Sequence, residues 1–112
     1  MTEIIIQIEN ELCTDEVVQF ANEAKRCVEL YTRENHDYGN SFYKGMDEIG
    51  IGYGVARIYG KMNRLITLTK KEVHVKDDNI DDILRDIACY SIIILAYRKR
   101  QIEKEHSKID FE

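Results

Sequence analysis

The sequence predicts an all-α fold, a compact helical bundle of three main helices with a short N-terminal element. The 112 residues include no proline and only six glycines, so long stretches lack the strongest helix breakers. In three of these stretches, apolar residues recur every three or four positions, which is the spacing of one helix face. A content of 44% hydrophobic and 33% charged residues is typical of a folded chain, and the length suits one domain, residues 1–112.

The first two stretches predict amphipathic helices. The first follows Thr14, a residue type that favours the N-cap position, and the second ends at Lys70-Lys71. The apolar positions of the first are Val17, Ala21, Ala24, Val28 and Tyr31. Those of the second are Ile51, Val55, Ile58, Met62 and Leu65.

The third stretch predicts the longest helix, from Ile80 to about Lys104. Between Ile87 and Tyr97 it is apolar nearly all the way round, which is typical of a helix at the centre of a bundle. Small helical domains often bury such surface by self-association, so we expect a homo-oligomer.

The remaining segments are expected to be connections or a short end element. We expect connections at 35–50 and 70–79. The stretch from Ile4 to Leu12 fits either a strand or a helix by its spacing, and we favour a short helix.

Composition excludes several classes of protein. No run of about 18 apolar residues occurs, and Ile4-Ile5-Ile6 lacks the basic flank of a signal peptide, so we expect a cytoplasmic protein without membrane contact. Three cysteines without a C-x-x-C pair predict buried, reduced thiols and neither a disulfide framework nor a zinc site. The net charge of −5 makes duplex nucleic acid an unfavourable partner.

Acidic residues in the third predicted helix are the most specific chemical signal. Asp78, Asp82 and Asp86 share one helix face, and the same face becomes apolar downstream. We therefore expect these carboxylates to line a cleft that could hold a divalent cation. For Asp82 and the acids before it, capping of the helix N-terminus is the simpler interpretation. Asp86 lies beyond the first turn and is the candidate catalytic residue.

The second predicted helix carries a basic stripe. Arg57, Lys61 and Arg64 stand at i, i+4 and i+7, an arrangement that suits phosphate oxygens. The alternative is that they pair with acidic side chains of neighbouring helices. Glycines 50, 52, 54 and 60 weaken a helix, so we expect close approach of another helix to be their reason.

The segment from Glu34 to Phe42 concentrates acid, imidazole, phenol and amide groups. Such density is typical of a recognition loop or of a tight turn. Its candidate residues for recognising a base are His36, Tyr38 and Asn40.

Three blocks stand in order along the chain: Asn35 to Phe42, Arg57 with Lys61 to Leu65, and Asn79 to Tyr90. Together, over roughly Asn35 to Tyr97, they resemble the nucleotide modification associated domain type one family. Members of that family are small helical proteins, frequent in phages and encoded beside genes for modified-base synthesis. The resemblance implies a nucleotide-handling protein of phage type, with a nucleotide or another phosphorylated small molecule as its partner.

That family is in turn similar to the all-α nucleoside triphosphate pyrophosphohydrolases, the MazG-like and dimeric dUTPase-like enzymes. Those enzymes bind magnesium through an E-x-x-E on one helix and an E-x-x-D on another. This chain has Glu34-x-x-Asp37 and Asp82-x-x-x-Asp86, but it departs from the pattern by lacking an E-x-x-E in its first predicted helix. The resemblance implies magnesium ligands at Asp37, Asp82 and Asp86, and phosphate ligands at Arg57, Lys61 and Arg64.

Two functional hypotheses follow from different classes of protein. The first is a magnesium-dependent pyrophosphohydrolase acting on dNTPs or modified dNTPs, which the stripe of carboxylates favours. The second is a non-catalytic protein that binds or sequesters a nucleotide, or a helical subunit of a phage-encoded complex, which the missing E-x-x-E favours. A third option is a purely structural helical bundle.

Overall fold

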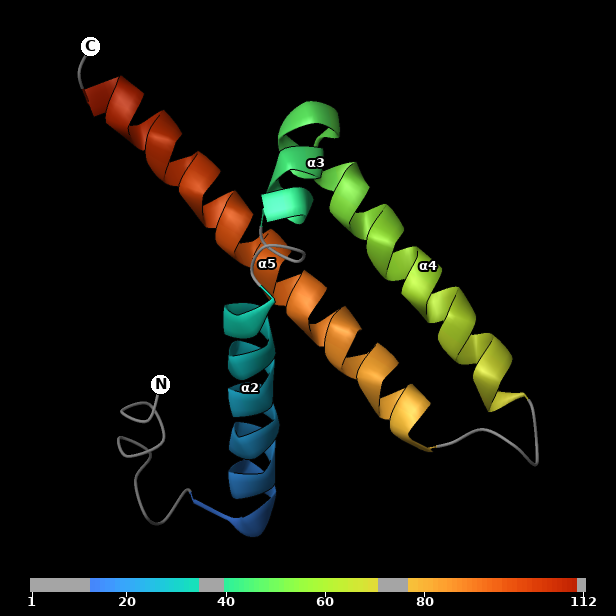
Figure 1. The fold of residues 1–112 in the computed structure, drawn as a ribbon. Coiled ribbons are helices and arrows are strands. Elements are labelled where there is room, and N and C mark those ends of the chain that lie inside the picture. Colours follow the sequence, from blue (N-terminus) through green and yellow to red (C-terminus); the bar gives the residue numbers. More distant parts are fainter. Residues whose placement is uncertain (1–12, 35–39, 71–76, 111–112) are drawn as a thin grey trace.

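Nearly all of the described part of the chain is helical in the computed structural model, which describes residues 13–34, 40–70 and 77–110 (Figure 1). Four helices follow one another: α2 (Asp15–Arg33), α3 (Ser41–Ile49), α4 (Ile51–Thr69) and α5 (Asp77–Asp110). No strand occurs within these ranges, so the all-α prediction is confirmed. The N-terminal element predicted for Ile4 to Leu12 lies outside the described residues.

The ends of α2 and α4 lie where the sequence places them. The Thr14 hydroxyl accepts a hydrogen bond from the backbone N–H of Val17 at 3.3 Å, and α2 begins at the next residue after this cap. Acidic residues follow in its first turn and Arg33 stands in its last, which complements the helix dipole. The helix predicted after Gly50 is α4, and it ends at Thr69.

The prediction of a connection over residues 35–50 was wrong for its second part, which forms α3. Phe42 and Met46, one turn apart, are the buried residues of this helix. Gly45 contacts the ring of Tyr53, so its missing side chain makes room for an aromatic one. Gly50 adopts a φ of 103°, a conformation that favours glycine, and this turn lets α4 begin immediately after α3 ends.

A small aromatic core joins α3, α4 and α5. Its buried members are Phe42, Met46, Tyr90 and Ile93. The Phe42 ring lies 4.9 Å from the Tyr90 ring, centroid to centroid, within the favourable range for aromatic pairs. A Cβ on Gly54 would come within 2.8 Å of the Ile94 side chain, so this glycine allows α4 to approach α5 closely, as expected.

The long helix α5 lies between α4 and α2 and packs on both, which confirms the prediction of a central helix (Figure 1). On the α2 side, Cys27 and Cys89 are both buried, and the Cys89 thiol lies 3.8 Å from the Cys27 carbonyl oxygen. Cys13 is exposed, so the prediction of three buried thiols was wrong for this residue.

The arrangement is more open than the predicted compact bundle. The radius of gyration is 17.3 Å, whereas a compact domain of this length has a radius of about 13 Å. The C-terminal end of α5 projects past the other helices, and α2 approaches the middle of α5 at an angle instead of lying along it (Figure 1). The predicted compactness was therefore wrong, because the helices do not all lie side by side. Within the described ranges, none of the helices is long and apolar enough to cross a bilayer.

Candidate functional site

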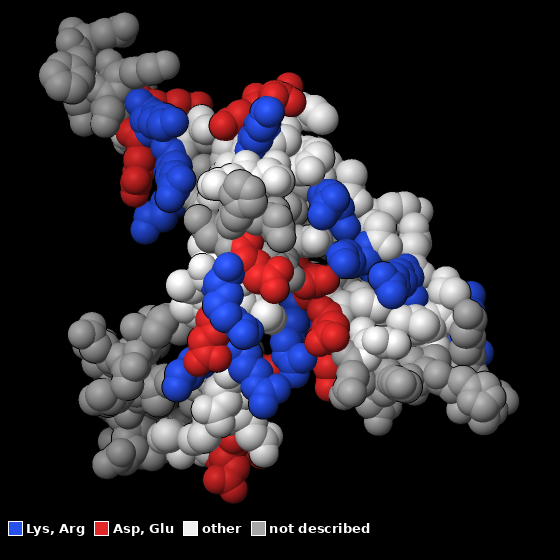
Figure 2. Space-filling model, in the orientation of Figure 1, with Lys and Arg blue, Asp and Glu red and all other residues white. Residues whose placement is uncertain are grey.

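The basic stripe forms one flank of α4 and surrounds a shallow hollow. This hollow has a volume of about 370 Å³, and its lining residues all belong to α4. They are Ala56, Arg57, Gly60, Lys61 and Arg64. Figure 2 shows basic side chains along α4, with acidic side chains beside them over α5. We call Arg57, Lys61 and Arg64 the basic flank.

Arg57 links the basic flank to the aromatic core. Its guanidinium donates a hydrogen bond to the Tyr90 hydroxyl at 3.3 Å and lies 5.6 Å from the centre of the Tyr90 ring. The hydrogen bond to Tyr90 is the main cause of a raised pKa for Arg57, although desolvation opposes it. Arg57 is therefore a fixed positive charge whose position depends on the packing of Tyr90.

Lys61 forms an ion pair across the α4–α5 contact. Its ammonium nitrogen lies 2.9 Å from a carboxylate oxygen of Asp86, and the two side chains are 28% and 20% exposed. The structure thus brings together a predicted phosphate ligand and the predicted catalytic carboxylate. Asp86 also contributes to the raised pKa of Arg57.

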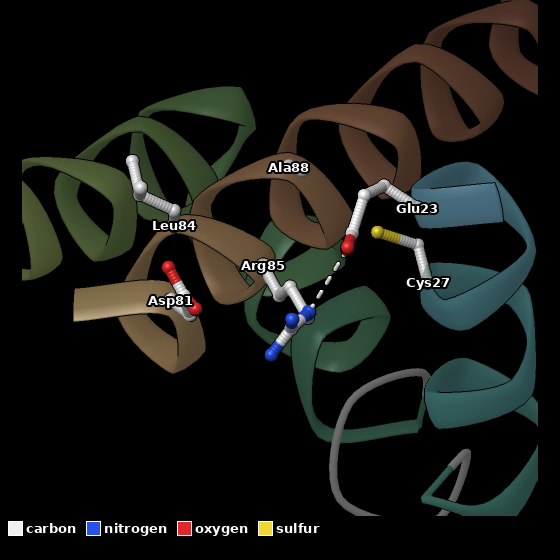
Figure 3. Close-up of a pocket in the computed structure, with 6 residues that line it drawn as sticks. All are labelled: Glu23, Cys27, Asp81, Leu84, Arg85 and Ala88. Atoms are coloured by element: carbon white, nitrogen blue, oxygen red, sulfur yellow. Dashed lines mark hydrogen bonds and ion pairs between the residues drawn. The ribbon is translucent and has the colours of Figure 1, made fainter. Parts of the chain in front are cut away.

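The other acidic candidates lie in different surroundings. Asp82 is 74% exposed and pairs with Arg85 at 3.4 Å, and Arg85 also pairs with Glu23 of α2 at 3.1 Å. Figure 3 shows this second contact at the edge of a cavity of about 380 Å³ between α2 and α5, where the Cys27 side chain also lies. Across residues 13–34, 40–70 and 77–110, no three Asp, Glu, His or Cys residues are placed together to hold a metal ion.

Most of the predicted recognition loop, including Asp37, His36 and Tyr38, lies outside the described residues. Asn40 is described: it directly precedes α3, and its side chain is exposed. The magnesium set of Asp37, Asp82 and Asp86 and the base contacts therefore remain predictions. In the structure the described pair of carboxylates, Asp82 and Asp86, is held by Arg85 and Lys61 respectively.

The family model described as nucleotide modification associated domain 1 matches residues 34–97, which is more than half of the chain. The chain belongs to this family. The matched region contains α3, α4, the aromatic core, the basic flank and Asp86, while α2 lies before it. No curated protein and no solved structure matches the chain.

The sequence alone did not identify two residues that position candidate site residues or join the helices around them. Tyr90 supports Arg57, although the two lie 33 positions apart, and its apolar neighbours suggested only a core role. Arg85 connects α5 to Glu23, 62 positions away. The spacing of charges within one helix predicts its faces, but it does not identify the helix on which such a side chain will find its partner.

Proposed function

We propose that this chain binds a nucleotide through its phosphates in the hollow on α4. The observation that supports this best is the local charge. The hollow is lined by three cations in a chain whose net charge is −5, and among the described residues Asp86 is the acid that forms an ion pair with one of them. Phosphate oxygens accept hydrogen bonds from guanidinium and ammonium groups, and arginine can bind them with two parallel bonds.

The three cations are not equally available to a ligand. Arg57 is held by Tyr90 and Lys61 by Asp86. Arg64 is exposed, and among the described residues it has no ion-pair partner. A phosphate would therefore make its first contact with Arg64 and complete its coordination with Lys61 and Arg57.

Arg64→Ala is the sharpest test of this site, because it removes a charge without removing a contact of the core. We expect the dissociation constant for a nucleoside triphosphate to rise by about ten-fold to 100-fold, corresponding to about 1.5–3 kcal/mol for charge-assisted hydrogen bonds. Arg57→Ala and Lys61→Ala should weaken binding on the same scale. Calorimetric titration with the four standard dNTPs and with inorganic triphosphate measures the dissociation constant of each variant.

Arg33→Ala is the matched control, since Arg33 lines a separate hollow between α2 and α5 with Arg26 and Arg85. The affinity of the Arg33→Ala variant for a nucleoside triphosphate should equal that of the unmodified chain. If Arg33→Ala lost binding while Arg64→Ala kept it, the anion would bind on the α2 side of the molecule instead. No binding by the unmodified chain to any member of the panel would refute the proposal.

The second candidate function is a magnesium-dependent pyrophosphohydrolase acting on dNTPs or modified dNTPs. It is supported by the position of Asp86 beside the basic flank and by Asp82, which precedes it by one turn of α5. Carboxylate oxygens are the ligands that Mg²⁺ prefers, and these two residues would hold it together with Asp37. A bound Mg²⁺ would neutralise the phosphoanhydride and favour ionisation of a coordinated water.

Release of pyrophosphate distinguishes the two functions. The enzyme hypothesis requires turnover that needs magnesium and disappears in Asp86→Asn, while the helical circular dichroism signal persists. The binder hypothesis requires binding without turnover, undiminished by a chelator, and Asp86→Asn should then bind phosphate at least as tightly because a nearby negative charge is gone. Asp81→Asn, an exposed acid on the same helix, should change neither quantity.

A further inference from the structure

Large apolar side chains are more often exposed than buried in the described part of this chain. Thirteen are exposed, whereas the buried hydrophobic set contains seven residues. The whole chain exposes 8970 Å² of surface, while a compact monomer of 13.2 kDa exposes about 6,400 Å². A standard interface buries about 800 Å² on each partner, so the excess surface is more than enough for one.

Five of the exposed residues form a continuous stripe along α4, at successive spacings of four, four, three and four. They are Ile51, Val55, Tyr59, Met62 and Ile66, which we call the apolar flank. At 100° per residue, this flank and the basic flank lie on opposite sides of the face that packs on the core. All charged residues of α4 belong to the basic flank, so no charge has to be desolvated when the apolar flank is covered.

Two glycines of α4 support the same conclusion. A Cβ built on Gly52 or on Gly60 would meet nothing within 4 Å, so packing among the described residues of this chain explains neither glycine. With Ala56 they form an edge of small residues, one turn apart, beside the apolar flank. Glycine lowers helix stability and permits close approach of another backbone, which these two positions do not receive within the described structure.

We propose that the apolar flank is the contact surface between two copies of this chain, with α4 packed against α4 of the second copy. A second copy fits because, in a twofold contact, the same uncharged, apolar face of α4 on each copy covers its counterpart on the other. The small-residue edge also lets the two helices approach closely. Ala56 and Gly60 line both this edge and the hollow, so the second copy supplies a wall on the side that one chain leaves open.

Two double lysine variants test whether the apolar flank is the contact surface, one on α4 and one on α5, at residues with similar exposed fractions. Val55→Lys/Tyr59→Lys changes residues of the apolar flank that are 55% and 68% exposed, and Ile92→Lys/Leu95→Lys changes residues of α5 that are 53% and 64% exposed. Light scattering coupled to size exclusion, at micromolar protein without nucleotide, should give twice 13.2 kDa for the unmodified chain and for the α5 variant. The α4 variant should be a monomer, with a dissociation constant raised at least 100-fold.

Gly52→Leu provides a second measurement that does not depend on charge. Because no described residue of the same chain lies within 4 Å of a Cβ at this position, the helical signal should persist, while the bulkier side chain should raise the dimer dissociation constant at least tenfold. A monomeric unmodified chain, or an oligomer broken by the α5 variant and not by the α4 variant, overturns the proposal. If Val55→Lys/Tyr59→Lys loses its helical signal, another segment of the same chain covers this flank, which also overturns it.

Discussion

The two sides of α5 are built differently. On one side, α3 and α4 surround a cluster of buried aromatic and aliphatic side chains, and the family match covers this region. On the other side, α2 is joined to α5 by two buried cysteines and by the ion pair between Arg85 and Glu23. Hydrophobic packing holds the first side and polar contacts contribute more to the second, so the two should differ in stability and in tolerance to substitution.

Met46→Ala should have the largest effect on stability. Met46 is almost completely buried between α3 and its neighbours, and its loss should lower the free energy of unfolding by about 3 kcal/mol, the scale for truncating a core side chain. Cys27→Ala, on the α2 side, should lower it by about 1 kcal/mol or less because fewer atoms are removed. Urea denaturation followed by circular dichroism compares the two; equal losses would contradict the difference between the sides.

Two glycines in α4 should respond to alanine with opposite signs. Gly54→Ala places a Cβ against the Ile94 and Phe42 side chains, and overpacking of this kind should cost about 1–3 kcal/mol. Gly60→Ala meets open space and should raise helix stability by up to about 1 kcal/mol. Thermal melts in the monomeric Val55→Lys/Tyr59→Lys background, where no second copy contacts Gly60, should place the two midpoints on opposite sides of that of the background chain.

The two interhelical ion pairs should differ in strength. Asp86→Asn breaks a contact that is largely removed from water and should lower the free energy of unfolding by about 1–2 kcal/mol. Glu23→Gln breaks a contact whose acid is more than half exposed and should lower it by about 0.5 kcal/mol or less. A double-mutant cycle with Lys61→Met isolates the first pair, and a coupling energy near zero there would show that this pair does not stabilise the α4–α5 contact.

The smallest expected effect concerns the reactivity of the three cysteine thiols. Burial is the main cause that raises the pKa of Cys89 from 9.0 to about 12, so this thiol remains protonated at pH 8. The folded chain holds that proton more tightly than the unfolded chain, so the resulting stabilisation is complete below about pH 9 and is lost as the pH rises toward 12. A thiol reagent at pH 8 should label Cys13 quickly and Cys27 and Cys89 only after urea is added; rapid labelling of all three would contradict their burial.

The sequence predicted helices more accurately than it predicted their environment. The bounds of α2 and α4 follow from a cap residue, charged ends and a regular apolar spacing, all of which act within one helix. Helix α3 was missed because its segment contains Gly45 and ends at Gly50, and glycine is typical of loops, whereas here Gly45 makes room for the Tyr53 ring and Gly50 forms a turn. These functions depend on a partner that is distant in sequence or on a backbone angle, and residue spacing reveals neither.

The orientation of α4 was predicted only in part. The predicted inward face includes Ile58 and Leu65, which are partly buried, but also Val55 and Met62, which are exposed. The helix has apolar residues over more than one face, and periodicity does not decide which of them meets its own chain. The phosphate site shows the same difficulty: the basic flank is a property of one helix, but the pairing of Lys61 with Asp86 requires two.

The order of the helices along the chain has a consequence for synthesis on the ribosome. Helix α5 provides the surface on which both α2 and α4 pack, yet it is the last of the four to be translated. Until it emerges, α3 and α4 can meet each other, while α2 lacks its main partner. Until then the nascent chain exposes the apolar faces of its earlier helices, and these helices should pack cooperatively onto α5 once it leaves the exit tunnel.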